Sequence, residues 1–128
     1  MKKKTDRQKL KEKLDKICRE IILIRDDNRC QKCGKYVEGQ NAHCSHVIPK
    51  SKGDGLRWNF INLKLLCFHC HINWWHKNPL EAAEWFKGKF PKRWEILQEN
   101  KNIIEKYTIN KLEEMFIDFN KDLREIKK

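Results

Sequence analysis

Apolar residues recur with a helical period near the start of the chain. The recurring positions, at spacings of four, three, four and three residues, are Leu10, Leu14, Ile17, Ile21 and Ile24. Such spacing puts one apolar stripe on a helix. The pattern therefore predicts a helix over residues 5–27, with Thr5 at its start and Asn28 after its end.

Two short segments further along are typical of strands. Residues 42–47 form the first, which Pro49 closes, and residues 63–66 form the second. The residues between them at positions 50–57 include two glycines and several basic side chains. We expect an exposed, flexible basic loop there.

The rest of the chain is predicted to be helical. Residues 70–77 form the first helical segment, Asn78 and Pro79 supply the N-cap and first residue of the next, and residues 92–100 form a short third one. Thr108 caps the last helix. Its apolar side comprises Ile109, Leu112, Met115, Phe116, Phe119, Leu123 and Ile126.

Length and charge narrow the class of protein. The chain has 128 residues, which suits one domain. Its 29 basic and 18 acidic residues give a net charge of +11, which attracts polyanions such as a phosphate backbone, although a solvated Lys-rich helix is the alternative. No apolar run approaches the roughly 20 residues of a membrane span, and no secretory signal is recognisable. We expect no membrane partner and a cytoplasmic location, in a bacterial host or encoded by a phage.

Four of the six cysteines have metal-ligand spacing. They form two Cys-x-x-Cys pairs, Cys30 with Cys33 and Cys67 with Cys70. Two such pairs deliver four thiolates to one tetrahedral Zn²⁺, the alternative being four unrelated buried thiols. Cys18 and Cys44 have no such partner and are expected to be ordinary buried residues. A closed four-cysteine site holds a fold but has no open position to activate water.

All five histidines lie between positions 43 and 76. In chain order, the segments Ser45-His46-Val47-Ile48-Pro49, Asn62-Leu63 and Cys67-x-x-Cys70-His71 resemble the HNH endonucleases and their ββα-metal motif. The likeness covers residues 30 to about 76. A looser likeness, over residues 22–26, links the chain to the phage NinG recombination nucleases.

The HNH resemblance implies metal-dependent hydrolysis of DNA. It implies that His46 is the general base for the attacking water, a role that suits an imidazole with a pKa near neutral. Asn62 corresponds to the residue that steadies this base. His71 corresponds to a ligand of the catalytic ion, which is Mg²⁺, Mn²⁺ or another divalent cation.

Ser45 departs from the HNH pattern, because most members have Asp there as a metal ligand. His43 lies two residues earlier, on the same face of an extended strand, and is either a replacement ligand or an ordinary hydrogen-bonded strand histidine. His76 is a further candidate, but five residues after His71 is about 140° around an ideal helix. His76 therefore joins the site only if the helix is distorted or has ended.

Four basic residues flank the predicted site: Lys50, Lys52, Arg57 and Lys64. We expect them to contact DNA phosphates without reading the base sequence. DNA is thus the predicted partner, together with a possible phage recombination or packaging protein.

These inferences combine into an α+β fold: a ββα-metal (HNH) core with a Cys₄ zinc site, flanked by N- and C-terminal helices. The single domain, 1–128, divides into an N-terminal helix (1–28), the core (29–77) and C-terminal helices (78–128). The predicted function is an HNH endonuclease for phage or prophage recombination, packaging or repair, leaving 5′-phosphate and 3′-hydroxyl ends. The alternatives are a non-catalytic zinc-knuckle module that binds nucleic acid, and a scaffold whose last helix docks a nuclease or terminase subunit.

Overall fold

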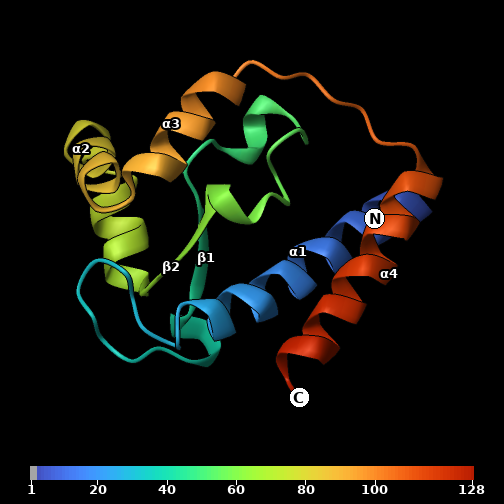
Figure 1. The fold of residues 1–128 in the computed structure, drawn as a ribbon, viewed down its shortest axis with the longest axis horizontal. Helices are drawn as coiled ribbons and strands as arrows, with labels where there is room; N and C mark the ends of the chain where they lie inside the picture. Colours follow the sequence, from blue (N-terminus) through green and yellow to red (C-terminus); the bar gives the residue numbers. More distant parts are fainter. Residues whose placement is uncertain (1–2) are drawn as a thin grey trace.

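Helices surround a two-stranded antiparallel sheet in the computed structural model, which describes residues 3–128 (Figure 1). The elements are α1 (Asp6–Arg25), β1 (His43–His46), β2 (Leu63–Leu66), the π-helix η4 (His69–Trp75), α2 (Pro79–Lys89), α3 (Pro91–Asn100) and α4 (Ile109–Ile126). Short 3₁₀ turns are η1 (Gly39–Asn41), η2 (Lys50–Lys52) and η3 (Phe60–Asn62). The fold is α+β, as predicted, with a small ββα core and flanking helices. None of the described helices is both long and apolar enough to cross a membrane.

Helix α1 begins at a capping box. The Thr5 hydroxyl accepts a hydrogen bond from the backbone N–H of Gln8, and the Gln8 side chain accepts one from the N–H of Thr5. These two bonds satisfy N–H groups that a helix start otherwise leaves free. The helix ends where Asp27 and Asn28 adopt positive φ angles of 55° and 53°, a conformation that these residue types tolerate better than most.

The sheet lies between two layers of helices. β1 pairs with β2 in the register His43 to Leu66 and His46 to Leu63. Helices α1 and α4 lie on one side of the strands, and α2 and α3 lie on the other (Figure 1). All four residues of β2 are buried as a result. Antiparallel strands commonly have one face open to water, and β2 has none.

A π-helix replaces the ordinary helix that the sequence predicts after β2. Within η4 the backbone N–H of His76 donates to the carbonyl of His71 at 3.2 Å, five residues back. A π-helical turn holds more than the 3.6 residues of an α-helical one. Residues five apart are therefore neighbours on this turn.

The loop between the strands is exposed only in its first half, so the expectation for residues 50–57 is wrong for the second half. Residues 50–53 are exposed, whereas Leu56 is buried. Gly55 lies so close to the segment around Ile103 that an added Cβ atom would be 2.9 Å from the Ile103 carbonyl oxygen. Packing against the core and this segment holds the second half in place.

Candidate functional site

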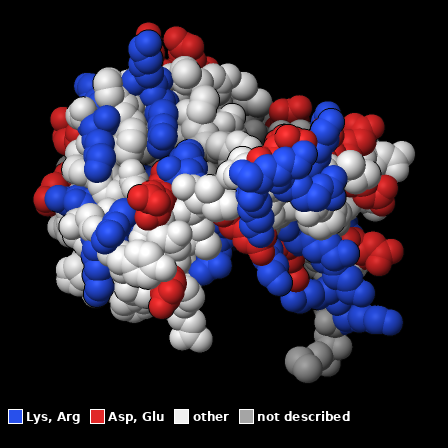
Figure 2. All heavy atoms as spheres, turned by 60° about the horizontal axis from the view of Figure 1, so that its bottom comes forward, with Lys and Arg blue, Asp and Glu red and all other residues white. Residues whose placement is uncertain are grey.

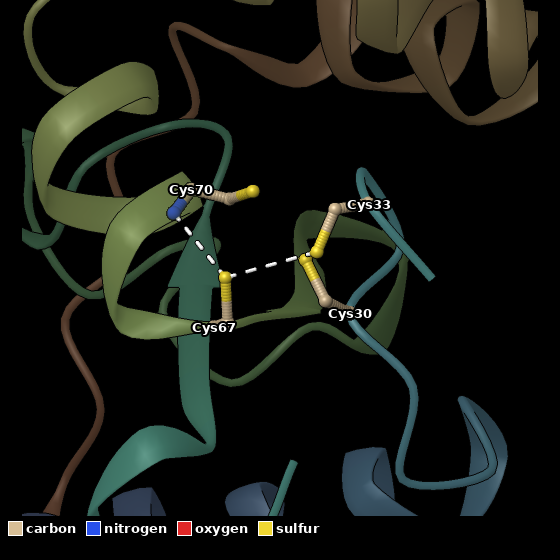
Figure 3. Close-up of side chains that lie close together, drawn as sticks. All are labelled: Cys30, Cys33, Cys67 and Cys70. Carbon is tan, nitrogen blue, oxygen red and sulfur yellow. Dashed lines mark hydrogen bonds between the residues drawn. The ribbon is translucent and has the colours of Figure 1, made fainter. Parts of the chain in front are cut away.

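The four cysteines of the Cys-x-x-Cys pairs converge on one point (Figure 3). Their sulfur atoms all lie within 4.8 Å of one another, and the Sγ atoms of Cys33 and Cys67 are 3.9 Å apart. Sulfurs arranged as a tetrahedron about 2.3 Å from a Zn²⁺ are about 3.8 Å from each other. The donors and their spacing therefore fit a structural zinc ion held by Cys30, Cys33, Cys67 and Cys70.

The first cysteine turn is shaped by its backbone. Gly34 has a φ of 78° and donates its N–H to the carbonyl of Cys30 at 2.8 Å, a turn for which glycine is favoured. Gln31 donates its N–H to the carbonyl of Leu65, at 2.9 Å, and so joins the turn to β2. Burial raises the pKa of the Cys30 thiol, but hydrogen bonds from nearby N–H groups outweigh burial and bring it to about 7, which favours the thiolate that binds metal.

Cys18 and Cys44 lie outside the four-cysteine cluster. Cys18 is buried and Cys44 is half-buried. Burial raises the pKa of both thiols, in Cys44 to about 11. Both residues therefore remain protonated thiols at neutral pH.

His46 ends β1 with one ring nitrogen fixed and one open. Its Nε2 lies 2.9 Å from the backbone carbonyl oxygen of Arg57. Because a carbonyl only accepts, Nε2 carries the proton in this bond and the lone pair of the neutral ring is on Nδ1. Burial lowers the pKa of His46, as do Lys50 and Lys64, while the Arg57 carbonyl and Asp15 raise it. The net direction favours a neutral base.

Asn62 closes the loop that follows β1. Its side-chain oxygen accepts from the N–H of Ile48 at 2.7 Å, and its Nδ2 donates to the carbonyls of Ile48 and Leu56, each at 3.0 Å. Asn62 is completely buried, so these bonds have no competition from water. One amide thus fastens both ends of the loop between residues 48 and 56.

Three histidines form a connected row beside the strands. His43 Nδ1 is 2.9 Å from His71 Nδ1, and His71 Nε2 is 3.1 Å from His76 Nε2. The π-helical turn brings His71 and His76 together. Burial, followed by the nearby cationic groups, lowers the pKa of His71 to about 4, so its ring is neutral and able to bind a metal.

Each contact of His71 uses a different ring nitrogen. A single ion takes one nitrogen from each imidazole, so the row as it stands offers an ion His71 with His43, or His71 with His76. Among residues 3–128, the four cysteines are the group of three or more ligand residues whose donor atoms lie close enough to share one ion. In this arrangement the histidine row offers one ion at most two imidazole ligands.

Ser45 makes its hydrogen bond with Lys64 and not with any of these histidines. It is completely buried, and the Nζ of Lys64 donates to its hydroxyl at 2.8 Å. The Lys64 ammonium also lies 3.3 Å from the ring centre of Trp75. Lys64 is itself completely buried, which corrects the expectation that it contacts DNA: both faces of β2 are covered by helices. Burial lowers the pKa of Lys64 well below its ordinary value.

Arg57 also forms its ion pairs within the protein. Its guanidinium pairs with the carboxylates of Asp15, at 2.6 Å, and Asp54, at 3.4 Å, so the expected phosphate contact is replaced by these ion pairs. Lys50 and Lys52 are exposed. On the face shown in Figure 2, basic side chains are densest around the N-terminal end, with acidic side chains among them.

Two cavities meet at His46. The larger, of about 730 Å³, lies between α1 and β1, and the smaller, of about 610 Å³, lies between the loop after β1 and helices α2 and α3. His46, His71, Cys44 and Lys50 line both. The open nitrogen of His46 and the histidine row therefore belong to one cleft.

Two carboxylates in this region were missed by the sequence reasoning. Asp15 contacts Arg57 across the cleft, and buried Asp26 accepts a hydrogen bond from the N–H of Leu65 in β2. One sign of the role of Asp15 is present in the sequence: this acidic residue directly follows Leu14, which belongs to the apolar stripe of the helix.

Comparison with known proteins links the central part of the chain to a known family. Residues 30–73 match the family model of the HNH endonucleases. Searches of curated proteins and of solved structures found no match to the chain. The matched segment includes the four cysteines, His46, Asn62 and His71, while α1 and His76 lie outside it.

The four-cysteine site is tested by counting zinc. We expect purified protein to hold one zinc ion per chain and the Cys67→Ser variant to lose it, because three thiolates no longer close the tetrahedron. Elemental analysis with a melting curve gives both readouts, since chelation of structural zinc also lowers the melting temperature. Cys18→Ala is the matched control and keeps its zinc. Equal zinc in Cys67→Ser and the parent would contradict the assignment.

Proposed function

We propose that the chain is a metal-dependent endonuclease that hydrolyses DNA phosphodiester bonds, because residues 30–73 match the family model of the HNH endonucleases. The observation that carries the proposal is the state of His46. Its Nε2 is occupied by the Arg57 carbonyl, its Nδ1 is left for a proton, and it stands where the two cavities meet.

His46 has the properties of a general base in this reaction. A water molecule in the cleft gives a proton to Nδ1 as its oxygen forms a bond to phosphorus. The bond from phosphorus to the 3′ oxygen breaks, and this oxygen takes a proton from solvent. The products are then a 5′-phosphate and a 3′-hydroxyl, as the family likeness implies. Asn62 acts indirectly, since it holds the loop whose next residue, Arg57, orients the base.

His71, with His76 or His43, is the proposed holder of the divalent ion. When bound, this ion supplies positive charge to the phosphoryl and leaving oxygens. The donors are imidazole nitrogens, because Ser45 is buried against Lys64. Imidazole suits Zn²⁺, Ni²⁺, Co²⁺ and similar ions, whereas Mg²⁺ prefers oxygen.

Lys50 and Lys52 are the proposed phosphate contacts. Both are exposed on the loop after β1, and Lys50 lines both cavities beside His46. A net charge of +11 draws the polyanion to the protein. These contacts position DNA without reading its sequence.

A second candidate is a zinc-knuckle module that binds nucleic acid without cutting it. The position of Ser45 favours it, because the residue that stands where the family has an acidic ligand is turned into the core. The two candidates share the zinc site and the basic charge, and they differ in whether His46 does chemistry.

Replacing the base tests the proposal. In a plasmid-nicking assay with Mg²⁺, Mn²⁺, Co²⁺ or Ni²⁺, we expect His46→Ala to lower the cutting rate by about 10²-fold or more while DNA affinity is kept. His69→Ala is the matched control, because His69 is exposed within the second cysteine pair and should cut normally. If the intact protein binds DNA but cuts none with any of these ions, the non-catalytic module is the better description.

The contact between His71 and His76 in the π-helical turn leads to a separate prediction, about the metal dependence of cutting. We expect His71→Ala to raise the metal concentration needed for half-maximal cutting by about tenfold to a hundredfold, since His71 is common to both possible ligand pairs. Comparing His76→Ala with His43→Ala in the same titration identifies its partner: the variant with the larger rise has lost the ligand. A titration unchanged in all three variants would place the ion elsewhere.

The pH profile follows from the environment of His46. The base works only when neutral, and burial lowers its pKa from the ordinary value of 6.5. The acid limb of kcat/KM is therefore expected below pH 6.5, because the neutral ring persists to lower pH. An acid limb above 6.5 in zinc-loaded protein would show that the charged ring is favoured instead.

A further inference from the structure

The structure assigns Asp15, on α1, the role of positioning residue for His46, an inference that rests on the proposed nuclease function. Asp15 Oδ1 accepts hydrogen bonds from Arg57 Nε at 3.0 Å and from Trp58 Nε1 at 2.8 Å. Its Oδ2 accepts from Arg57 Nη2 at 2.6 Å. One carboxylate thereby holds two consecutive side chains of the loop that reaches the cleft.

The residue held by Asp15 is the one that holds His46. The carbonyl of Arg57 accepts from His46 Nε2. An imidazole that loses this acceptor is free to turn its ring or to move its proton to Nδ1. In either case the lone pair no longer faces the cleft, and the base is lost even though every motif residue is present.

Burial makes this contact hard to replace. Trp58 is 4% exposed, so its indole N–H has no ready access to water if Asp15 is removed. The Arg57 side chain is 18% exposed, and its bidentate contact with Asp15 fixes the plane of the guanidinium. The backbone between these two side chains cannot shift without breaking one of the bonds.

The hydrogen bonds of Asp15 and those of Asn62 hold the same loop at different places; we call each set a clamp. Asn62 fastens the loop at the backbone of Ile48 and Leu56, and Asp15 fastens the side chains of the next two residues. Lys11, one turn earlier on α1, adds an ion pair to Asp54 at 2.5 Å. The Asn62 clamp lies inside the matched segment 30–73 and the Asp15 clamp lies outside it, so α1 contributes to the proposed site from beyond the family motif.

Charge argues against a direct role of Asp15 in binding DNA. A carboxylate at a phosphate-binding cleft repels the substrate, so removing its charge should leave DNA affinity equal or higher. A positioning role predicts instead a loss in the chemical step. The two effects have opposite signs and can be separated by kcat and KM.

The test compares Asp15→Asn with Glu12→Gln in the full-length, zinc-loaded protein. Glu12 lies one turn earlier on the same helix, pairs with Lys4 at an exposed position and also lines the larger cavity, so its variant makes the same charge change without removing a bond to Arg57 or Trp58. For Asp15→Asn we expect kcat to fall about tenfold to a hundredfold, as for a small misplacement of a catalytic group, with KM not raised. For Glu12→Gln we expect kcat within about twofold of the parent.

Nitrogen NMR of the His46 ring provides a readout that does not depend on activity. In the parent, neutral His46 should show its proton on Nε2; in Asp15→Asn the signals should shift toward a mixture of the two tautomers, with unchanged signals in Glu12→Gln. An unaltered His46 ring in folded Asp15→Asn, or an unaltered kcat, overturns the inference. If the parent protein cuts no DNA, the proposed function fails, and the NMR comparison still decides the role of Asp15.

A third variant covers failure of Asp15→Asn to fold. Arg57→Lys keeps the positive charge and the backbone carbonyl but loses the bidentate contact with Asp15. A mixed His46 tautomer in this variant supports the inference. A His46 ring identical to that of the parent overturns it.

Discussion

Two four-residue strands cannot hold themselves together in water, and the rest of this structure is arranged around that constraint. An isolated two-stranded sheet is at best marginally stable, and here the pair carries His46 at the end of β1. Support comes from side chains of α1 and of its C-cap residue, Asp26. Asp26 accepts from the N–H of Leu65, Arg25 donates to the carbonyl of Leu63, and Arg19 donates to the carbonyl of Ala42 just before β1. Leaving one such buried backbone group unpaired costs about 1–3 kcal/mol.

The four-cysteine cluster supplies the second support and also sets the position of the histidine row. It joins the turn after α1 to the end of β2, two segments that lie more than 30 residues apart in sequence. His71 directly follows Cys70, so a zinc ion at the cluster fixes the start of the π-helix and the ring beside it. The four-cysteine site and the proposed catalytic site thus use different ligands, but they are joined by the backbone between Cys70 and His71.

Local signals predicted the elements well because each depends on nearby residues. Thr5 and Thr108 cap their helices, residues 63–66 form the second strand, and the four cysteines meet. Two features depend on tertiary contacts and could not be predicted in this way. The π-helical turn that brings His76 to His71 is a change of helical pitch, which a residue spacing alone does not reveal.

Lys64 shows the second limit of sequence reasoning. Lys64 flanks the predicted site in the sequence, and that position led to the expected DNA contact. Here helices lie on both sides of the sheet (Figure 1), so the Lys64 side chain lies inside, against Ser45 and Trp75. Arg57 was misjudged for a similar reason, since its partner Asp15 is 42 residues away.

The buried lysine also bears on how this chain would manage without an acidic ligand at position 45. An Asp there would lie beside Lys64, the present hydrogen-bond partner of Ser45. Burial lowers the pKa of His46, His71 and Lys64 alike, so the interior behind the cleft favours uncharged bases. Neutral imidazoles leave the charge of a divalent ion unbalanced by the protein. Under the proposed function the balancing negative charge comes from the DNA phosphate itself, which couples metal binding to substrate binding.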